Sequence, residues 1–407
     1  MGDLEKIEKA ADKVRRETEK GYKVAVVVSA MAGVTNELAE FCKAISPVYD
    51  SREYDTVVSS GEQVTAGLMA IALQKRGLQA RSWMGWQLPI ECSDFHSQAR
   101  IMNIEKPLLI HRLEEGEIAV IAGFQGISQS GRITTLGRGG SDTSAVALAA
   151  AIEAQRCDIY TDVDGVYTAD PRIVPKARKR KELAYEEMLE MASVGAKVLQ
   201  TRSVEMAMKK RVPVQVLSSF NESIGSLFPG TTIKSEEDIV EYEVVNGITA
   251  SKDDAKIVLR NVPDVPGLAA KVFGPLSESQ INVDMIVQNV SADTKKTDMT
   301  FTVPRADMDK ALEILQKQKD LKDLPVSGEK SVTKISVVGI GMRSHAGVAQ
   351  KMFKTLADKG INIQVISTSE IKISVLIDEE YTELALRALH SAYGLDQEEN
   401  DRDEHLI

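Results

Sequence analysis

The sequence predicts an α/β protein, in which a first domain with a largely parallel sheet is followed by two smaller modules that repeat one another. Three observations lead to this prediction. Apolar strands alternate with helices through the first half of the chain, a segment of the second half recurs 80 residues later, and 407 residues exceed what one core usually holds. The composition, 43% hydrophobic but only 5% aromatic, fits such a fold.

The first domain begins with a helix, because apolar residues recur at helical spacing from Leu4 until Gly21, a residue that favours a helix C-cap. An almost uninterrupted apolar run, Lys23 to Ala30, then predicts a buried strand. The same alternation predicts helices at 55–76, 107–115 and 143–155 and strands near 81, at 118–124 and at 158–162. Strands that are apolar on both faces and separated by helices imply a largely parallel sheet between two helical layers.

The second half of the chain contains a duplication. KIVLRNVPDVPGLAAKVFGPLSESQINVDMIVQNV resembles KISVVGIGMRSHAGVAQKMFKTLADKGINIQVISTSE, and their identities share one 80-residue spacing: Gly267/Gly347, Lys271/Lys351, Phe273/Phe353, Ile281/Ile361 and Asn282/Asn362. Each copy runs strand, glycine-containing turn, helix and strand, and another strand and helix follow it. Each copy therefore predicts a ferredoxin-like βαββαβ module.

The regular pattern lapses between 221 and 241, where Gly, Pro, Ser and acidic residues predict a domain boundary. We therefore expect a first domain at 1–235 and modules at 245–328 and 329–395. The highly charged end, 396–407, is expected to be a mobile acidic tail.

The net charge and the cysteines indicate which binding partners and which cellular location to expect. A net charge of −10 and a pI near 5.3 argue against nucleic acid and anionic membranes, which require basic patches. No apolar run approaches the roughly 20 residues of a membrane span. Cys42, Cys92 and Cys157 lie far apart and outside any metal-binding spacing, so reduced thiols and a cytoplasmic location are expected. Small molecules remain the expected partners.

The most informative motif is TTLGRGGSDTSAVALAAA, residues 134–151. Glycines 137, 139 and 140 allow a tight turn and a close approach to a ligand, and Ser141 and Asp142 follow at the start of a helix. Backbone N–H groups and the helix dipole would face an anion there, and Arg138 adds a fork for a carboxylate or phosphate. The alternative is a glycine-rich turn with a helix cap. The motif is neither a Walker A loop nor a Rossmann fingerprint.

Two further turns carry polar residues after predicted strands. SAMAGVTNEL places Ser29 and Thr35 past the end of a buried strand, where open α/β sheets bind ligands, although either hydroxyl could equally be a helix cap. SSGEQVTAGLMAIAL begins with Glu62, the lone charge of an apolar helix. Its carboxylate could receive a substrate ammonium, or it could be a first-turn glutamate favoured by the helix dipole.

A fourth segment, YTDVDGVYTADPRIVPKARK, leads from a strand into an acidic loop. Its aspartates could place a magnesium nucleotide, Tyr167 could stack on a base and Arg172 could meet phosphate; a solvated acidic turn is the alternative. Lys197, after a small-residue turn, could contact phosphate or could be a surface lysine.

Together, these segments and the paired C-terminal modules resemble the aspartokinase family, from Gly2 to about Gly394. Related acetylglutamate, glutamate and uridylate kinases would not be expected to combine these motifs with two such modules. The resemblance implies a three-layer amino acid kinase domain followed by two ferredoxin-like ACT domains. It further implies ATP-dependent phosphorylation of the β-carboxylate of L-aspartate, with Mg²⁺, in a reaction that depends on positioning and charge neutralisation.

The resemblance also implies roles for individual residues. Arg138 would bind the α-carboxylate of aspartate and Glu62 its ammonium, while Asp142 would organise a catalytic lysine. The other substrate contacts would be Ser29, Thr35, Gly139 and Ser141. The nucleotide site would comprise Thr161, Asp162, Tyr167, Arg172, Lys197 and Val198.

Feedback control by lysine or threonine is implied for the ACT domains. Their ligand would lie between Asp264, Gly267, Ala269, Asn282, Asp284 and Gln288 of the first module and Asn362, Ile363, Thr368 and Glu370 of the second. A homo-oligomer that pairs through ACT domains, or a heteromer with an ACT-only subunit, is expected.

One departure from the family bears on activity. Family members open with a strand and the motif K-[FY]-G-G-[ST]-S-[VL], whose lysine approaches the transferred phosphoryl group, whereas Gly2 resumes the resemblance just after that motif. We therefore expect the lysine, the glycines and a central strand to be absent. Three hypotheses follow: an active aspartokinase whose opening segment lies upstream, a catalytically silent amino-acid sensor, and a kinase of the same fold with another acyl acceptor.

Overall fold

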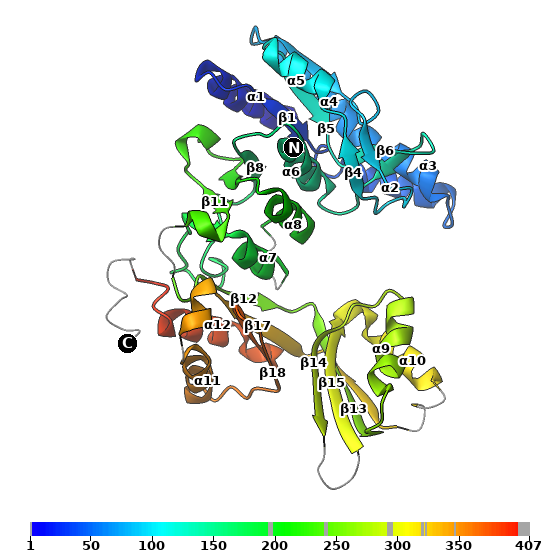
Figure 1. The fold of residues 1–407 in the computed structure, drawn as a ribbon, viewed down its shortest axis with the longest axis vertical. Coiled ribbons are helices and arrows are strands. Elements are labelled where there is room, and N and C mark those ends of the chain that lie inside the picture. Colours follow the sequence, from blue (N-terminus) through cyan, green and yellow to red (C-terminus); the bar gives the residue numbers. More distant parts are fainter. Residues whose placement is uncertain are drawn as a thin grey trace. The chain divides into compact units, whose positions relative to one another are not determined.

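In the computed structural model the chain forms two compact units (Figure 1). The structure describes residues 2–193, 198–239, 243–290, 296–318, 321, 324–345 and 347–397. Of these, the first unit holds 2–166, 180–192 and 198–239, and the second unit holds the rest. Most of the predicted tail, 398–407, lies outside the described residues. In the part of the chain that the structure describes, no helix combines the length and hydropathy of a membrane span.

The first unit contains every predicted helix, together with helices for which no range was predicted. The helices are α1 (Leu4–Glu19), α2 (Val34–Ile45), α3 (Ser51–Val58), α4 (Ser60–Gln74), α5 (Pro107–Glu114), α6 (Gly140–Ala151), α7 (Tyr185–Ser193) and α8 (Thr201–Lys210). Asp3 caps α1 by accepting from the N–H of Lys6, and Gly21 follows its end with φ of +89°. The helix expected at 55–76 is divided at Ser59 into α3 and α4.

Strands of the first unit form separate sheets. A parallel sheet has the order β1 (Ala25–Val28), β5 (Ile118–Ala122), β2 (Ala80–Trp83). A mixed sheet has the order β8 (Cys157–Thr161), β10 (Val214–Ser218), β11 (Thr231–Lys234), β9 (Glu182–Ala184), in which only the β10–β11 pair is antiparallel. A small sheet has the order β4 (Ile101–Ile104), β3 (Ile90–Cys92), β6 (Gln125–Ser128), β7 (Ile133–Thr135). The α/β fold with mostly parallel sheets is therefore confirmed, although two sheets replace the single central one.

Strand β5 shows why helices cover both faces of its sheet. All five of its residues are buried, and they alternate between two apolar clusters. Ile118, Val120 and Ala122 join the cluster formed with α1 and α4, whereas Ala119 and Ile121 join the cluster that includes α5 and α6. This arrangement is the three-layer packing that the continuous apolar runs predict.

The second unit contains two four-stranded antiparallel sheets. The first module comprises β13 (Asp254–Pro263), α9 (Leu268–Glu278), β14 (Asp284–Val290), β15 (Lys296–Pro304), α10 (Met308–Lys317) and β16 (Val326–Glu329), with sheet order β14-β15-β13-β16. The second comprises β17 (Val332–Val338), α11 (Val348–Asp358), β18 (Val365–Thr368), β19 (Lys372–Asp378) and α12 (Thr382–Ala392), and its sheet order is β12-β17-β19-β18. Gly267 and Gly347, with φ of +87° and +100°, occupy equivalent positions before α9 and α11, as the duplication predicts.

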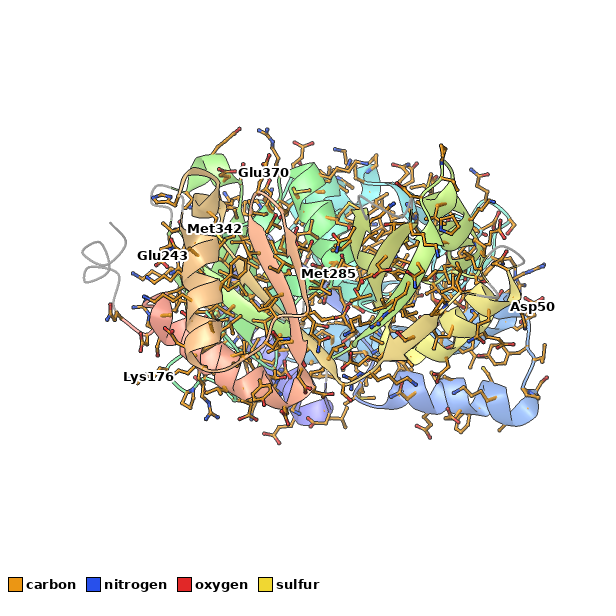
Figure 2. All side chains as sticks on the ribbon, turned by 90° about the horizontal axis from the view of Figure 1, so that it is seen from below. Asp50, Lys176, Glu243, Met285, Met342 and Glu370 are labelled. Atoms are coloured by element: carbon orange, nitrogen blue, oxygen red, sulfur yellow. The ribbon has the colours of Figure 1, made fainter. Side chains whose placement is uncertain are left out.

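Strand β12 (Gly247–Ser251) requires a correction to the predicted module limits. It precedes the first module in the chain, but it pairs antiparallel with β17 of the second, from Gly247 opposite Val338 to Ser251 opposite Lys334. The first module is thus inserted between two strands of the second. Met285 of β14, labelled in Figure 2, packs with Val332, Val365 and Leu376, so the two modules share apolar contacts.

Candidate active site

The carboxyl ends of β1 and β5 hold several of the predicted substrate residues. Ser29 directly follows β1, and the N–H of Gly123, just beyond β5, donates to Val28 O at 3.0 Å. A Cβ at Gly123 would lie 3.0 Å from the hydroxyl oxygen of Ser141, so the start of α6 approaches this edge closely. Ser29 and Ser141 therefore flank the same pair of strand ends. Thr35, in the first turn of α2, is half-buried.

Glu62 is buried beside the segment that follows β1. Its side chain is only 3% exposed, and Oε1 accepts from the N–H of Ala30 at 3.0 Å. Oε2 is also buried, and it has no hydrogen-bond partner among the described residues. Burial raises the pKa of Glu62 to about 7, against a smaller opposite effect of the Ala30 N–H. The close fit extends to Gly61, where a Cβ would lie 2.8 Å from that of Ala30.

The glycine-rich loop turns sharply into α6. Gly137 and Gly139 have φ of +77° and +69°, a region in which other residues are strained, and α6 begins at Gly140. The helix starts three residues earlier than predicted, so Asp142 lies in its first turn, where burial raises the pKa of its carboxyl. Arg138 is exposed at the tip of the loop. The loop thus presents a guanidinium and a helix N-terminus together.

Two residues that the sequence analysis missed fix the strand leading into this loop. Asp55, fully buried on α3, accepts from the hydroxyl and the N–H of Thr135 at 2.6 and 3.0 Å, and also from the N–H of Ser97. Arg202 of α8 donates to the carbonyl of Leu136 at 2.6 Å. Nothing in the sequence indicates these roles, because the partners of Asp55 lie 42 and 80 positions away.

The predicted nucleotide residues are divided between the units. Thr161 ends β8 in the first unit, where its hydroxyl donates to Asp162 at 3.1 Å, and Val198 is a half-buried residue of the same unit. Tyr167 and Arg172 belong to the second unit, in which Arg172 pairs with a neighbouring aspartate at 2.7 Å. Lys197 lies outside the described residues.

A buried lysine on α1, also missed from the sequence, anchors the loop after β10. Lys13 donates to the carbonyls of Ser218, Asn221 and Ser223 at 3.0, 2.6 and 3.3 Å, and its ammonium lies 4.6 Å from the ring of Tyr160. Burial lowers the pKa of Lys13 to about 8. Because Ser218 is the last residue of β10, this lysine fixes the chain at the carboxyl end of the strand beside β8.

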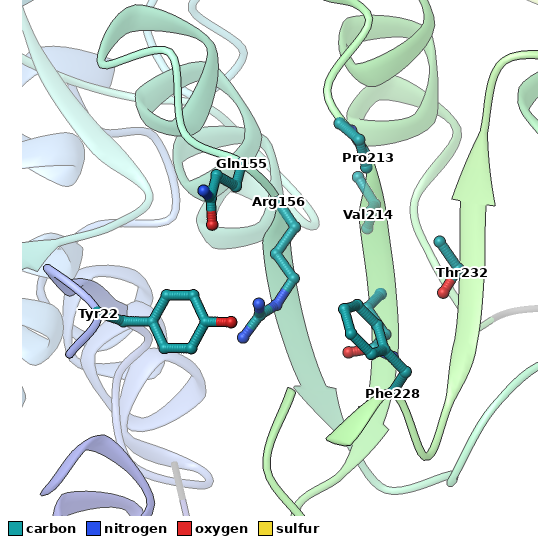
Figure 3. A pocket seen from close by; sticks show the side chains of 8 residues that line it. Tyr22, Gln155, Arg156, Pro213, Val214, Phe228 and Thr232 are labelled. Atoms are coloured by element: carbon teal, nitrogen blue, oxygen red, sulfur yellow. The ribbon is translucent and has the colours of Figure 1, made fainter. Parts of the chain in front are cut away.

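A pocket of about 150 Å³ lies at the opposite, amino-terminal ends of β8 and β10 (Figure 3). The guanidinium of Arg156 lies between the rings of Tyr22 and Phe228, 5.0 and 5.5 Å from their centres. The pocket is lined by Tyr22, Gln155, Arg156, Pro213, Val214, Gln215, Phe228 and Thr232. None of them belongs to the predicted active site.

In the second unit, the predicted effector residues follow the duplication. Asp264, Gly267 and Ala269 are exposed around the turn from β13 to α9, and Asn282 precedes β14 as Asn362 precedes β18. Ile363 is half-buried, and the exposed members near β14 and β18 are Gln288, Thr368 and Glu370.

Asp284 is paired with the other module. It accepts from Lys334 of β17 at 2.8 Å, and this buried lysine also donates to Asp254 at 3.2 Å. The structure therefore brings Asp284 to the boundary between the two sheets.

Comparison with known proteins now identifies the family. A model described as the amino acid kinase family matches residues 1–218, and an ACT domain model matches 256–318 and 335–393. An aspartate kinase of Pseudomonas putida is 52% identical over 398 residues, 97% of this chain and 95% of its own. The structure of E. coli aspartokinase III with aspartate and ADP (R-state) has a TM-score of 0.78 at 25% identity, covering 96% of this chain and 97% of that one. The same enzyme with lysine and aspartate (T-state) has a TM-score of 0.70 at 26% identity, covering 90% and 92%. The chain therefore belongs to the aspartokinase family, the aspartate kinases that join an amino acid kinase domain to C-terminal ACT domains.

Proposed function

We propose that this chain transfers the γ-phosphoryl group of ATP to the β-carboxylate of L-aspartate, giving 4-phospho-L-aspartate, the first step towards lysine, threonine and methionine. The observation that carries this proposal is the buried carboxylate of Glu62, beside the strand end that Ser29 and Ser141 flank. One oxygen of that carboxylate has no hydrogen-bond partner among the residues that the structure describes. The related E. coli enzyme bound to aspartate and ADP supports it. The free cysteines support a cytoplasmic location.

Substrate selection rests on two opposite charges. Glu62 receives the α-ammonium, and Arg138, exposed in the glycine loop, binds the α-carboxylate through its two parallel N–H groups. Charge-assisted hydrogen bonds contribute about 1.5–3 kcal/mol each, which is enough to select a free amino acid over an acylated one. Thr35, Gly139 and Ser141 complete the contacts to the substrate.

Chemistry at this site depends on positioning, because the β-carboxylate of the substrate is itself the nucleophile. The chain therefore needs no nucleophile of its own and little base catalysis. N–H groups of the glycine loop and the dipole of α6 stabilise negative charge near the transferred group, and Asp142 orients the cationic groups there. Magnesium, arriving with the nucleotide, would neutralise phosphate charge when bound.

The nucleotide half of the site comprises Thr161 and Asp162 at the end of β8, Tyr167 and Arg172 of the following loop, and Lys197 with Val198. Because β8 and β10 are parallel, both their carboxyl ends lie at one edge of the sheet, where open α/β folds bind ligands. Lys13 supports this proposal, since it fixes the loop that leaves β10 at that edge.

We further propose feedback inhibition by lysine, threonine or both through the ACT modules, at the ten effector residues described above. The lysine-bound T-state of the E. coli relative supports an inhibitor site in this family. An effector inhibits only by binding the inactive state better, with a coupling of about 1–3 kcal/mol. The modules would pair between subunits, either in a homo-oligomer or with an ACT-only subunit.

The test is acyl phosphate formation from ATP, Mg²⁺ and L-aspartate, trapped with hydroxylamine. It compares the 407-residue chain with one extended at its N-terminus by a segment carrying K-F-G-G, and L-glutamate serves as the control acceptor. Turnover of L-aspartate by the 407-residue chain supports the proposal, and R138Q should then raise its KM for aspartate at least tenfold. Turnover by the extended chain alone would leave the family assignment standing but refute activity of the 407-residue chain. If neither chain phosphorylates L-aspartate although both bind lysine or threonine, the kinase proposal fails, and the hypothesis of a catalytically silent amino-acid sensor takes its place.

A further inference from the structure

The first turn of α8 lies against the glycine-rich loop. A Cβ at Gly139 would lie 1.9 Å from Cγ of Gln200, the N-cap residue of α8, so the loop passes this side chain at a distance that only a glycine permits. Gln200 is itself fixed, because its carbonyl accepts from the N–H and the hydroxyl of Ser203 at 3.0 and 2.7 Å. Further along α8, Met206 packs against the apolar cluster that holds Leu148 of α6. The position of the loop therefore depends on that of α8.

Arg202, in the same first turn, joins the loop to a second segment of the chain. Its guanidinium donates to the carbonyl of Leu136, which directly precedes the loop, and to that of Ala99, both at 2.6 Å. Leu136 and Ala99 are buried, at 1% and 0% exposed, so the guanidinium takes the place of water as the donor to their carbonyls. Because both donors belong to one rigid planar group, they set the distance between the two carbonyls as well as binding each of them.

The segment that includes Ala99 is bonded to the same strand one residue earlier. The N–H of Ala99 donates to Thr135 O at 2.9 Å, and Asp55 accepts from the N–H groups of Ser97 and Thr135, both at 3.0 Å. Asp55 therefore secures the end of β7, whereas Arg202 secures the point at which the loop begins.

The positive charge of Arg202 serves this bridge and not an ion pair. Among the residues that the structure describes, the two carbonyls are the acceptors of its hydrogen bonds, and no carboxylate forms a salt bridge with it. Burial lowers the pKa of Arg202, and the charge of Arg100 acts in the same direction. A half-buried guanidinium without a counter-ion is costly, and its bonds to the backbone offset that cost.

We propose that Arg202 is a positioning residue for aspartate: by joining the start of the glycine-rich loop to Ala99, it holds the loop in the conformation in which Arg138 meets the substrate. Under the proposed function, on which this inference rests, Arg138 binds the α-carboxylate of aspartate. Gly137 and Gly139, both at positive φ, give the free loop a wide choice of conformations. Fixing the start of the loop reduces the entropy that it loses when the substrate binds.

The test compares R202M, which keeps an unbranched stem but removes both donors, with R202K, whose single ammonium cannot reproduce the fork. R202M should raise the KM for L-aspartate about tenfold and R202K about threefold. The kcat and the KM for ATP should stay within twofold of the wild type, because the contact to the α-carboxylate is the same in the ground state and the transition state. R202K decides the question if R202M does not fold.

R76M is the matched control. Arg76 is another half-buried arginine of the first unit, and it bonds to Glu8 and Asp12 of α1. R76M should keep the wild-type KM for L-aspartate although it lowers the Tm. Equal rises of that KM in R202M and R76M would show a general effect of stability and would overturn the inference.

A double-mutant cycle shows whether Arg202 acts through Arg138. If it does, R202M should raise the KM for L-aspartate less than twofold in an R138Q background, because the contact that it positions is already lost. A further rise of about tenfold in that background would overturn the inference, since the effect of Arg202 would then be independent of Arg138.

Calorimetric binding of L-aspartate needs no turnover, so it keeps this inference separate from the proposed function. About tenfold weaker binding by R202M than by the wild type supports the inference, whereas equal binding by the two overturns the inference alone. If the wild-type chain does not bind L-aspartate, the proposed function fails and the inference fails with it.

Discussion

Replacement of Glu62 by glutamine should stabilise the first unit above neutral pH while it weakens aspartate binding. The rise of this pKa from 4.5 to about 7 corresponds to about 3 kcal/mol, at 1.36 kcal/mol per pH unit. The folded state holds the proton more tightly than the unfolded state does. Stability linked to Glu62 is therefore greatest below pH 4.5 and is lost as the pH rises through about 7.

E62Q cannot ionise, so it behaves as the protonated form at every pH. It should match the wild type near pH 4.5 and exceed its unfolding free energy by about 3 kcal/mol at pH 8. Under the proposed function the same charge receives the substrate ammonium. The wild-type KM for aspartate should therefore fall as the pH rises through about 7. Above that pH the KM of E62Q should stay roughly 10–100-fold higher than that of the wild type.

Urea unfolding followed by tryptophan fluorescence measures this effect selectively. The sequence has two tryptophans, Trp83 and Trp86, and both belong to the first unit. E37Q, at an exposed first-turn position of α2, is the matched control and should unfold like the wild type at each pH. A stability difference between E62Q and the wild type that stays constant from pH 4.5 to 8 would refute the assignment of a buried, destabilising charge to Glu62.

Three further predictions concern buried polar groups. D55N should lower the stability of the first unit by about 3 kcal/mol, measured by the same fluorescence, because an amide cannot accept all the hydrogen bonds that this carboxylate receives; an unchanged midpoint would contradict it. K334M should lower the calorimetric Tm of the second unit by leaving Asp254 and Asp284 without their cation, and adding D254N should restore part of the loss. Burial lowers the pKa of His390, so the second unit should lose stability as the pH falls below 6.5; H390Q should remove this dependence, and a wild-type Tm constant between pH 7 and 5 would contradict it.

The duplication was predictable because it is a property of spacing alone. The glycines at 267 and 347 repeat both a sequence position and a left-handed backbone, and each is followed by a helix with the same buried spacing. Strand β12 could not be assigned in this way. Its partner β17 lies about 80 residues away, and no local pattern indicates which of two similar sheets a short apolar strand will join.

In the candidate site, too, a residue was predictable where its own helix singles it out and was missed where its partners are distant in the sequence. Glu62 stood out because it is the lone charge in an apolar helix, and the structure places it inside. Asp55 and Lys13 are also buried, and they hold other parts of the first unit in place. They lie in helices with several other charges, however, where a further charged residue predicts only a solvated face. The sequence of residues 167–179 gave no local indication that Ala169 and Val174 pack in the apolar core of the second module.

The insertion of one ACT module within the other has a consequence for synthesis. During translation, Ser251 of β12 emerges about 80 residues before Val332 of β17, so at roughly 5–20 residues per second the strand waits about 4–16 seconds for its partner. The intervening module can fold during that delay, since its own four strands are contiguous. The sheet of the second ACT module, which includes β12, is completed last. Until then the exposed edge of β12 can pair with a strand of another nascent chain. Slow translation beyond β16 should therefore favour misassembly, and the order of synthesis becomes a determinant of yield.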